Sequence, residues 1–147
     1  MRTGLRGKDI ENDIQRYGRC VLCVGGEADS PPFAYTIGNW LRGLPELLII
    51  GTIKGALLNN LSQKLIERGA AFEEGELVNL GGKFPVKIVT ADQRAQRDYT
   101  IQAGQYHGTE DYPVQQVLAC DRSGHFPDDP ACQPPYSTLP MFNRRTQ

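Results

Sequence analysis

Short stretches rich in apolar and β-branched residues alternate along the chain with turn-forming residues. Six of them have the length of β-strands and are bounded by glycine, proline or polar residues: 20–24, 33–38, 47–50, 76–80, 86–90 and 114–120. Gly81 and Gly82 connect the fourth stretch to the fifth and suit a hairpin turn, because glycine adopts dihedral angles that other residues avoid. The pattern predicts six short strands.

A helical repeat follows the third stretch. Leu57, Leu61 and Leu65 are spaced four residues apart, which places them on one face of a helix. Thr52 precedes the repeat at a position that suits a helix cap, and Gly69 follows it where a left-handed residue commonly ends a helix. The pattern predicts an amphipathic helix between these two residues.

Two further segments show a weaker helical pattern. Ile10 and Ile14 have helical spacing within residues 8–17, and Gly18 is expected to end that helix. Another helix is expected after Asp92, which suits a cap. Its apolar face would carry Ala95, Tyr99 and Ala103.

This order of elements predicts the α+β class, as a small six-stranded mixed or antiparallel barrel with two or three outer helices. The order is similar to that of the flavin-binding split barrel, in which early strands and a following helix build a cofactor site, commonly across a dimer interface. A barrel of another topology and an open α+β sheet fit the same pattern. We expect one globular domain over residues 1–134 and a loose proline-rich tail over residues 135–147.

The composition is that of an ordinary soluble protein, with 39% hydrophobic residues, 22% charged residues and a formal net charge of -1. This charge gives no reason to expect a nucleic-acid partner, because binding to phosphates requires clustered basic residues. The sequence has no run of about eighteen apolar residues and begins with a polar segment, so we expect neither a membrane span nor a secretory signal. A cytoplasmic location is the resulting expectation.

The four cysteines raise the question of a metal or redox site. Cys20 and Cys23 form a C-x-x-C pattern, but the residues between them are typical of a strand. Side chains three positions apart in a strand point to opposite faces, so this pair is not expected to bind zinc or to form a redox turn. We expect two or three of the four cysteines to be buried, reduced thiols.

Several segments carry a family resemblance: PPFAYTIG, PELLIIG and LLNNL between residues 31 and 61, and PVQQVLACDRSGHFP near residues 114–127. Together they resemble the domain-of-unknown-function 4262 family of small bacterial, phage and plasmid proteins, over roughly residues 13–134. The resemblance implies no activity. The chain departs from the family pattern at Leu44, where a histidine often precedes Pro-Glu-Leu, and at Asp128, where an aromatic residue often follows Phe-Pro. If that histidine acts in catalysis or ligand binding, this chain has lost the role.

The stretch 33–38 contains the best candidate ligand site. Bulky residues alternate there with Ala34, Thr36 and Gly38, which would leave a shelf for a planar ligand. The Thr36 hydroxyl and the Asn39 amide are placed to orient such a ligand. The alternative is that the small residues only make room for a packed helix.

The phosphate of a nucleotide-like ligand is expected where the chain enters the helix. Thr52 and Lys54 lie in that segment, where unpaired N–H groups and the helix dipole attract anions, and Arg42 adds a cationic group. The alternative is that Thr52 caps only its own backbone. FMN is the possible cofactor that the split-barrel resemblance implies. The residues assigned to cofactor binding are Thr36, Gly38, Asn39, Arg42, Thr52, Lys54 and Gln116.

Gln115 and Gln116 are adjacent in the last predicted strand, so one of the two is expected to face inward. A buried amide without hydrogen-bond partners costs about 1–3 kcal/mol. The inward amide therefore contacts either the edge of a ligand ring or a neighbouring backbone segment.

The histidines and the acidic segment 121–129 are weaker candidates. The segment contains His125 and several carboxylates, but its spacing lacks the oxygen donors of a calcium loop and favours a tight turn, so no metal site is predicted. His107 is expected near the end of a helix, where the dipole favours a cationic ring. Neither histidine has a partner in the sequence that fixes a role as a proton donor. Glu46 is expected to form at most a surface pair with Arg42.

Three functions remain open, and the sequence does not decide whether the chain is an enzyme. The first is a ligand-binding or flavin-dependent barrel that acts as a homodimer. The second is a non-enzymatic interaction or sequestering protein of phage or plasmid type, which binds a partner protein or a signalling nucleotide. Its apolar anchors would be the Tyr112–Pro113 edge and, in the tail, Tyr136, Met141 and Phe142. The third is a hydrolase or metal enzyme built on His125 and its neighbouring aspartates.

Overall fold

The computed structural model describes residues 7–26, 30–52 and 54–142. Its elements are α1 (Gly7–Tyr17), β1 (Cys20–Val24), β2 (Phe33–Ile37), the 3₁₀ helix η1 (Asn39–Arg42), β3 (Glu46–Ile50), α2 (Gly55–Arg68), β4 (Glu76–Val78), β5 (Val86–Thr90), α3 (Arg94–Asp98), α4 (Ile101–His107), β6 (Val114–Leu118) and the 3₁₀ helix η2 (Tyr136–Thr138). All six predicted strands are present. The helix expected after Asp92 is divided into α3 and α4.

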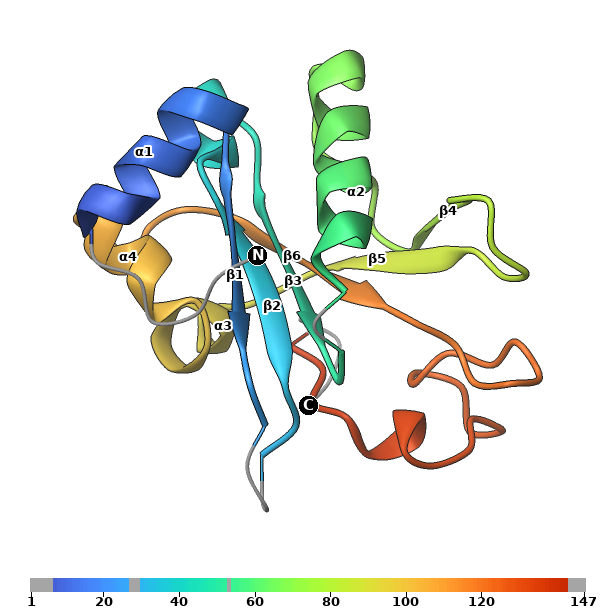
Figure 1. The fold of residues 1–147 in the computed structure, drawn as a ribbon. Helices are drawn as coiled ribbons and strands as arrows, with labels where there is room; N and C mark the ends of the chain where they lie inside the picture. The colour runs from blue at the N-terminus through green and yellow to red at the C-terminus, as the bar shows by residue number, and fades with distance from the viewer. Residues whose placement is uncertain (1–6, 27–29, 53, 143–147) are drawn as a thin grey trace.

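The six strands form one mixed sheet in the order β1-β2-β3-β6-β5-β4 (Figure 1). The central strands β3 and β6 are parallel, and the other neighbours are antiparallel. The α+β class is confirmed, but the predicted barrel is wrong, because β1 and β4 lie at opposite edges of an open sheet. The sequence pattern identifies strands but does not specify whether the two outermost strands pair with each other.

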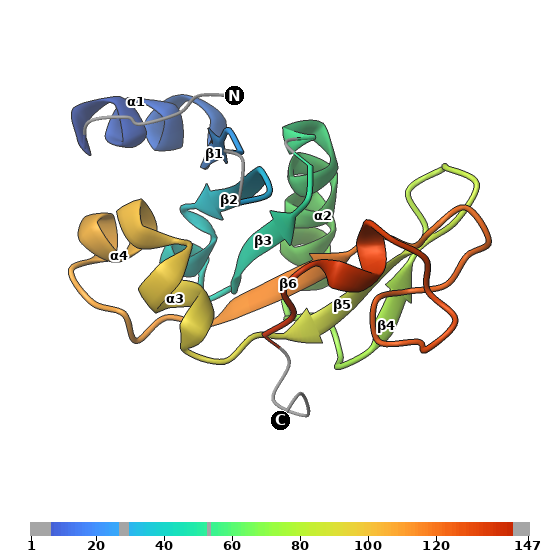
Figure 2. The ribbon, with the colours of Figure 1, turned by 90° about the horizontal axis from the view of Figure 1, so that it is seen from below.

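Helices cover both faces of this sheet and create two cores (Figure 2). On one face, α2 places Leu58, Leu61 and Leu65 against a cluster that includes residues of β2, β3, β5 and β6. On the other face, α1, α3 and α4 contribute to a second cluster. Coverage on both faces accounts for the continuous burial of β3 and β6, in which no position faces solvent.

The alternation of side chains along β1 separates the C-x-x-C pair. Cys20 lies in the core cluster beneath α1, and Cys23 lies in the cluster beneath α2. The expected divergence of the two thiols is confirmed, and none of the four cysteines forms a disulfide.

The C-terminal segment crosses the sheet on the face that carries α3 and α4 (Figure 2). Phe142 is buried in the second core cluster, and its carbonyl accepts a hydrogen bond from the backbone N–H of Asp92 at 2.7 Å. A part of the segment predicted to be a loose tail therefore packs against the domain, while residues 143–147 lie outside the described residues. None of the helices among the described residues has the length and apolar character needed to cross a membrane.

Candidate functional site

The structure divides the predicted cofactor-binding residues among three places. Four of them lie between the end of β2 and the end of η1: Thr36, Gly38, Asn39 and Arg42. Thr52 and Lys54 lie at the other end of β3, next to the start of α2. Because β3 separates Arg42 from Lys54, these two cations are not placed around one phosphate. Gln116 lies in the middle of β6.

Glu46 is the centre of the first group. Its carboxylate accepts hydrogen bonds from the Thr36 hydroxyl at 2.7 Å and from the Nε2 atom of His107 at 2.8 Å. It also accepts the backbone N–H groups of residues 38, 39 and 40, at 2.9, 3.1 and 3.3 Å respectively. A carboxylate with this many donors stabilises the turn between β2 and β3, because it satisfies the N–H groups that η1 leaves unpaired.

His107 reaches Glu46 from the last residue of α4. Its ring lies 4.9 Å from the Trp40 ring and 5.1 Å from the Tyr112 ring, measured between centroids. The side chain of His107 is 1% exposed and that of Glu46 is 0% exposed. The expected position of His107 at a helix end is confirmed, whereas Glu46 pairs with His107 and not with Arg42.

The pairing of Glu46 with His107 is not evident from the sequence. The one signal in the sequence is Glu46 itself, a carboxylate at the start of an apolar run. If that run forms a central strand, the carboxylate is buried and needs a hydrogen-bond partner. The identity of the partner was not accessible, because His107 is 61 positions away along the chain. Only the packing of α4 against β2 brings the two together.

The small face of β2 is covered by α2. Ala34 belongs to the α2 core cluster, Thr36 is fully buried, and the Asn39 Nδ2 atom donates to the Ser62 hydroxyl of α2 at 3.0 Å. At Gly38, an added β-carbon would lie 3.1 Å from the Arg19 Cα atom. In this structure the small residues make room for a helix and a neighbouring strand, which is the alternative to a ligand shelf.

The entry to α2 contains a local turn contact and, among the described residues, no side-chain cap. Lys54 is the residue before the helix, and its backbone N–H donates to the Thr52 hydroxyl at 3.3 Å. The Thr52 side chain thus binds the backbone of its own segment, which is the alternative to a phosphate site at this residue. The ammonium of Lys54 is exposed to solvent.

Gln115 and Gln116 are both buried and both bind backbone. The Gln115 amide pairs with Phe72 on the α2 face, accepting its N–H at 3.1 Å and donating to its carbonyl at 2.7 Å. The Gln116 amide points to the other face, where it donates to the Pro140 carbonyl at 2.7 Å and accepts the Phe142 N–H at 2.9 Å. Each amide therefore fixes one segment that crosses the sheet, and Gln116 holds both neighbours of Met141.

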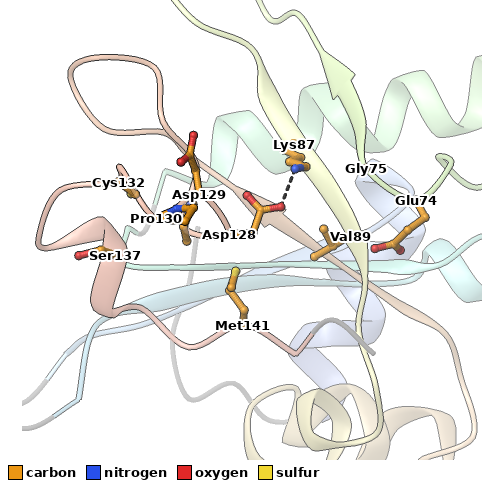
Figure 3. A pocket seen from close by; sticks show the side chains of 11 residues that line it. Glu74, Gly75, Lys87, Val89, Asp128, Asp129, Pro130, Cys132, Ser137 and Met141 are labelled. Atoms are coloured by element: carbon orange, nitrogen blue, oxygen red, sulfur yellow. Dashed lines mark hydrogen bonds and ion pairs between the residues drawn. The ribbon is translucent and has the colours of Figure 1, made fainter. Parts of the chain in front are cut away.

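A pocket of about 670 Å³ lies on the Gln116 face of the sheet, between β5 and the C-terminal segment (Figure 3). We call it the C-terminal pocket. Its residues come from the start of β4, from β5, from the loop after β6, from η2 and from the segment beyond it. They are Glu74, Gly75, Lys87, Val89, Pro127, Asp128, Asp129, Pro130, Cys132, Ser137 and Met141. The volume is within the range of small-molecule sites.

The charged groups of the C-terminal pocket are predominantly acidic. Asp128 forms an ion pair with the Lys87 ammonium at 2.5 Å, as drawn in Figure 3. Glu74 and Asp129 add two further carboxylates, which accept backbone N–H groups of Thr90 and Ala131. Burial raises the pKa of the Cys132 thiol, and the neighbouring carboxylates act in the same direction, so this thiol is neutral at physiological pH.

Asp121 organises the loop that leads to this pocket. Its carboxylate accepts the backbone N–H groups of Ser123 and His125 at 2.9 Å each and that of Gln133 at 2.8 Å. The tight turn predicted for this segment is present, with the Gly124 N–H bonded to the Asp121 carbonyl at 3.1 Å. Within the described residues, no group of three or more potential metal ligands occurs here or elsewhere.

The hydrogen bond from the His125 N–H, together with those from Gln133 and Ser123, lowers the pKa of Asp121. A lowered folded-state pKa contributes stability above the unfolded value of about 4, and this contribution is lost as the pH falls through the folded pKa. We therefore expect Asp121→Asn to be less stable than the natural chain at neutral pH, with the difference shrinking below about pH 4. Urea unfolding at several pH values measures this; a constant difference would contradict it.

The comparisons with known proteins identify the family and no closer relative. The search of curated proteins and the search of solved structures found no match, so the resemblance to flavin-binding split barrels gains no support. Of the two departures from the family pattern, Leu44 is a buried core residue and Asp128 lines the C-terminal pocket. A family model described as Domain of unknown function (DUF4262) matches residues 13–133, and the chain therefore belongs to this family.

Proposed function

We propose that this chain is a small-molecule-binding domain whose ligand occupies the C-terminal pocket. The observation that carries the proposal is the pocket of about 670 Å³, which is lined by segments that lie far apart in the sequence. Val89 and Met141 give it an apolar base, and polar groups surround that base. An apolar surface with a few fixed polar groups is the usual composition of a ligand site.

The charges of the pocket favour a ligand with a cationic group. The one ammonium of the pocket, on Lys87, is paired with Asp128, and the three carboxylates of Asp128, Glu74 and Asp129 outnumber it. A primary amine or a guanidinium attached to a short apolar body matches both the carboxylates and the base formed by Val89 and Met141.

The same charges disfavour a phosphate in this pocket. The nucleotide-like or flavin-like ligand expected from the sequence would bring two or more negative charges close to three carboxylates, and like charges at short range repel. The proposed function thus keeps small-ligand binding and assigns this pocket to a ligand of the opposite charge.

Calorimetric titration tests this proposal, with n-butylammonium and arginine amide as cationic probes and AMP and FMN as anionic probes. We expect the cationic probes to bind and Asp129→Asn to weaken them about 10- to 100-fold, because Asp129 lines the pocket without being paired to Lys87 and one charge-assisted hydrogen bond has this value. Asp98→Asn is the matched control, because the Asp98 carboxylate is exposed on α3 and lies outside the pocket. Equal affinity in both variants, or binding of AMP and FMN alone, would contradict the proposal.

A second candidate function is a protein-interaction domain, and the distribution of exposed apolar residues favours a specific form of it. Two of the anchors expected from the sequence are buried, since Tyr112 is 2% exposed and Phe142 is 7% exposed. Among the described residues, the large apolar side chains that are exposed are those of Tyr17, Leu41, Leu77 and Ile101. Leu77 lies on the edge strand β4, which presents unpaired backbone groups that another chain, including a second copy, can pair with.

A further inference from the structure

Two arginines approach one another where α1, β1 and η1 meet. Arg19 follows α1 and precedes β1, and its Nη1 atom donates to the Asn59 side chain of α2 at 3.2 Å. Arg42 is the last residue of η1, and a β-carbon added at Gly18 would lie 3.1 Å from its Nη2 atom. Position 18 adjoins Arg19 in the chain, and the charge of Arg42 acts on the Arg19 guanidinium, so the two side chains lie in the same region of the molecule.

Neither arginine forms an ion pair with a carboxylate among the described residues. The charge of Glu46 acts on Arg19 from beyond ion-pairing distance, and the Glu46 oxygens already accept five hydrogen bonds. The Nε atom of Arg19 is buried and has no hydrogen-bond partner. Burial, and then the nearby charge of Arg42, lower the pKa of Arg19.

An oxyanion would offset the repulsion between these two charges. Its oxygens also match the planar donor geometry of guanidinium groups. The exposed Arg42 side chain is free to turn toward such a ligand, while Arg19 is held in place by Asn59. The site is separate from the C-terminal pocket, because none of its residues lines that pocket.

From this arrangement we infer that Arg19 and Arg42 form a binding site for the phosphate group of a small molecule. The inference is independent of the proposed function, since it rests on different residues and on the opposite charge. It also places Arg42, one of the residues assigned to a nucleotide-like ligand from the sequence, in an anion site with Arg19 in place of Lys54.

Phosphate-dependent stabilisation tests the inference with inorganic phosphate and AMP as probes, against chloride at matched ionic strength. We expect phosphate to raise the melting temperature of the natural chain, and Arg42→Gln to weaken the fitted phosphate affinity at least tenfold. Arg97→Gln is the matched control, because Arg97 is an exposed arginine on α3 whose side chain is 62% exposed. Since the Arg42 side chain makes no hydrogen bond or ion pair among the described residues, its replacement is expected to leave the fold intact.

The two probes distinguish the source of the phosphate. Tighter binding of AMP than of inorganic phosphate, with both lost in Arg42→Gln, supports a nucleotide-like ligand. Equal binding of the two, again lost in Arg42→Gln, supports the phosphate group as the recognised unit. Stabilisation no greater than that by chloride, or an equal loss in Arg42→Gln and Arg97→Gln, overturns the inference. Unchanged binding of the cationic probes by Arg42→Gln would show that the phosphate site and the C-terminal pocket are independent.

Discussion

Replacing Glu46 with alanine is expected to lower the free energy of unfolding by about 3–5 kcal/mol, because several buried donors lose their acceptor at once and each costs about 1–3 kcal/mol. The carboxylate is fully buried and serves His107, the Thr36 hydroxyl and three backbone N–H groups of the turn. Alanine leaves all of these donors without an acceptor in a site that water does not reach. Denaturant unfolding of the purified variant measures the change.

Glu67→Ala provides the matched control for this prediction. Glu67 is exposed near the end of α2, and we expect its replacement to change the stability by no more than about 0.5 kcal/mol. Glu46→Gln keeps the shape of the side chain and should retain some of the turn contacts. We therefore expect its free energy of unfolding to lie between those of Glu46→Ala and Glu67→Ala. A Glu46→Ala variant as stable as Glu67→Ala would show that the buried carboxylate does not stabilise the turn.

Replacing Gln116 with leucine is expected to detach the C-terminal segment and to abolish ligand binding in the C-terminal pocket. The amide makes two hydrogen bonds to the backbone on either side of Met141, which forms part of the apolar base of the pocket. Leucine leaves the Pro140 carbonyl and the Phe142 N–H without partners, at a cost of about 1–3 kcal/mol for each group that stays buried. Release of the segment into water avoids that cost.

The neighbouring residue supplies the control. Gln115 is as buried as Gln116 and binds backbone in the same manner, but it holds Phe72 on the opposite face of the sheet. Amide hydrogen exchange separates the two: the Phe142 N–H should exchange faster in Gln116→Leu, and the Phe72 N–H should exchange faster in Gln115→Leu. Equal acceleration of both amides in both variants would mean that each change unfolds the whole domain, and the assigned role of Gln116 would be wrong.

The local elements of this fold follow from the sequence because their signals are local. The spacing of Leu61 and Leu65, the stop at Gly69 and the double glycine between β4 and β5 each act within a few residues, and the structure has the predicted elements at these places. The interruption at Thr100 escaped prediction, since the helical pattern of apolar residues continues across it. There the Thr100 N–H bonds to the Ala95 carbonyl, five residues back, where a regular helix would bond four residues back.

The closure of the sheet and the composition of the sites depend on contacts between distant segments. The burial of Thr36 and Asn39 reflects the packing of α2 on β2, and the pairing of Glu46 depends on α4. The C-terminal pocket exists because Gln116 binds a segment that the composition alone marked as loose. A single sequence carries the residue types of these contacts but not their pairing.

The most direct test of the central claim is an amide NMR titration of the natural chain with arginine amide. The account predicts progressive shifts at Lys87, Val89, Cys132 and Met141, which line the C-terminal pocket on three different segments. The amides of η1 should remain unchanged. Shifts confined to residues outside the pocket, or no shift at saturating probe, would contradict the assignment of ligand binding to this pocket.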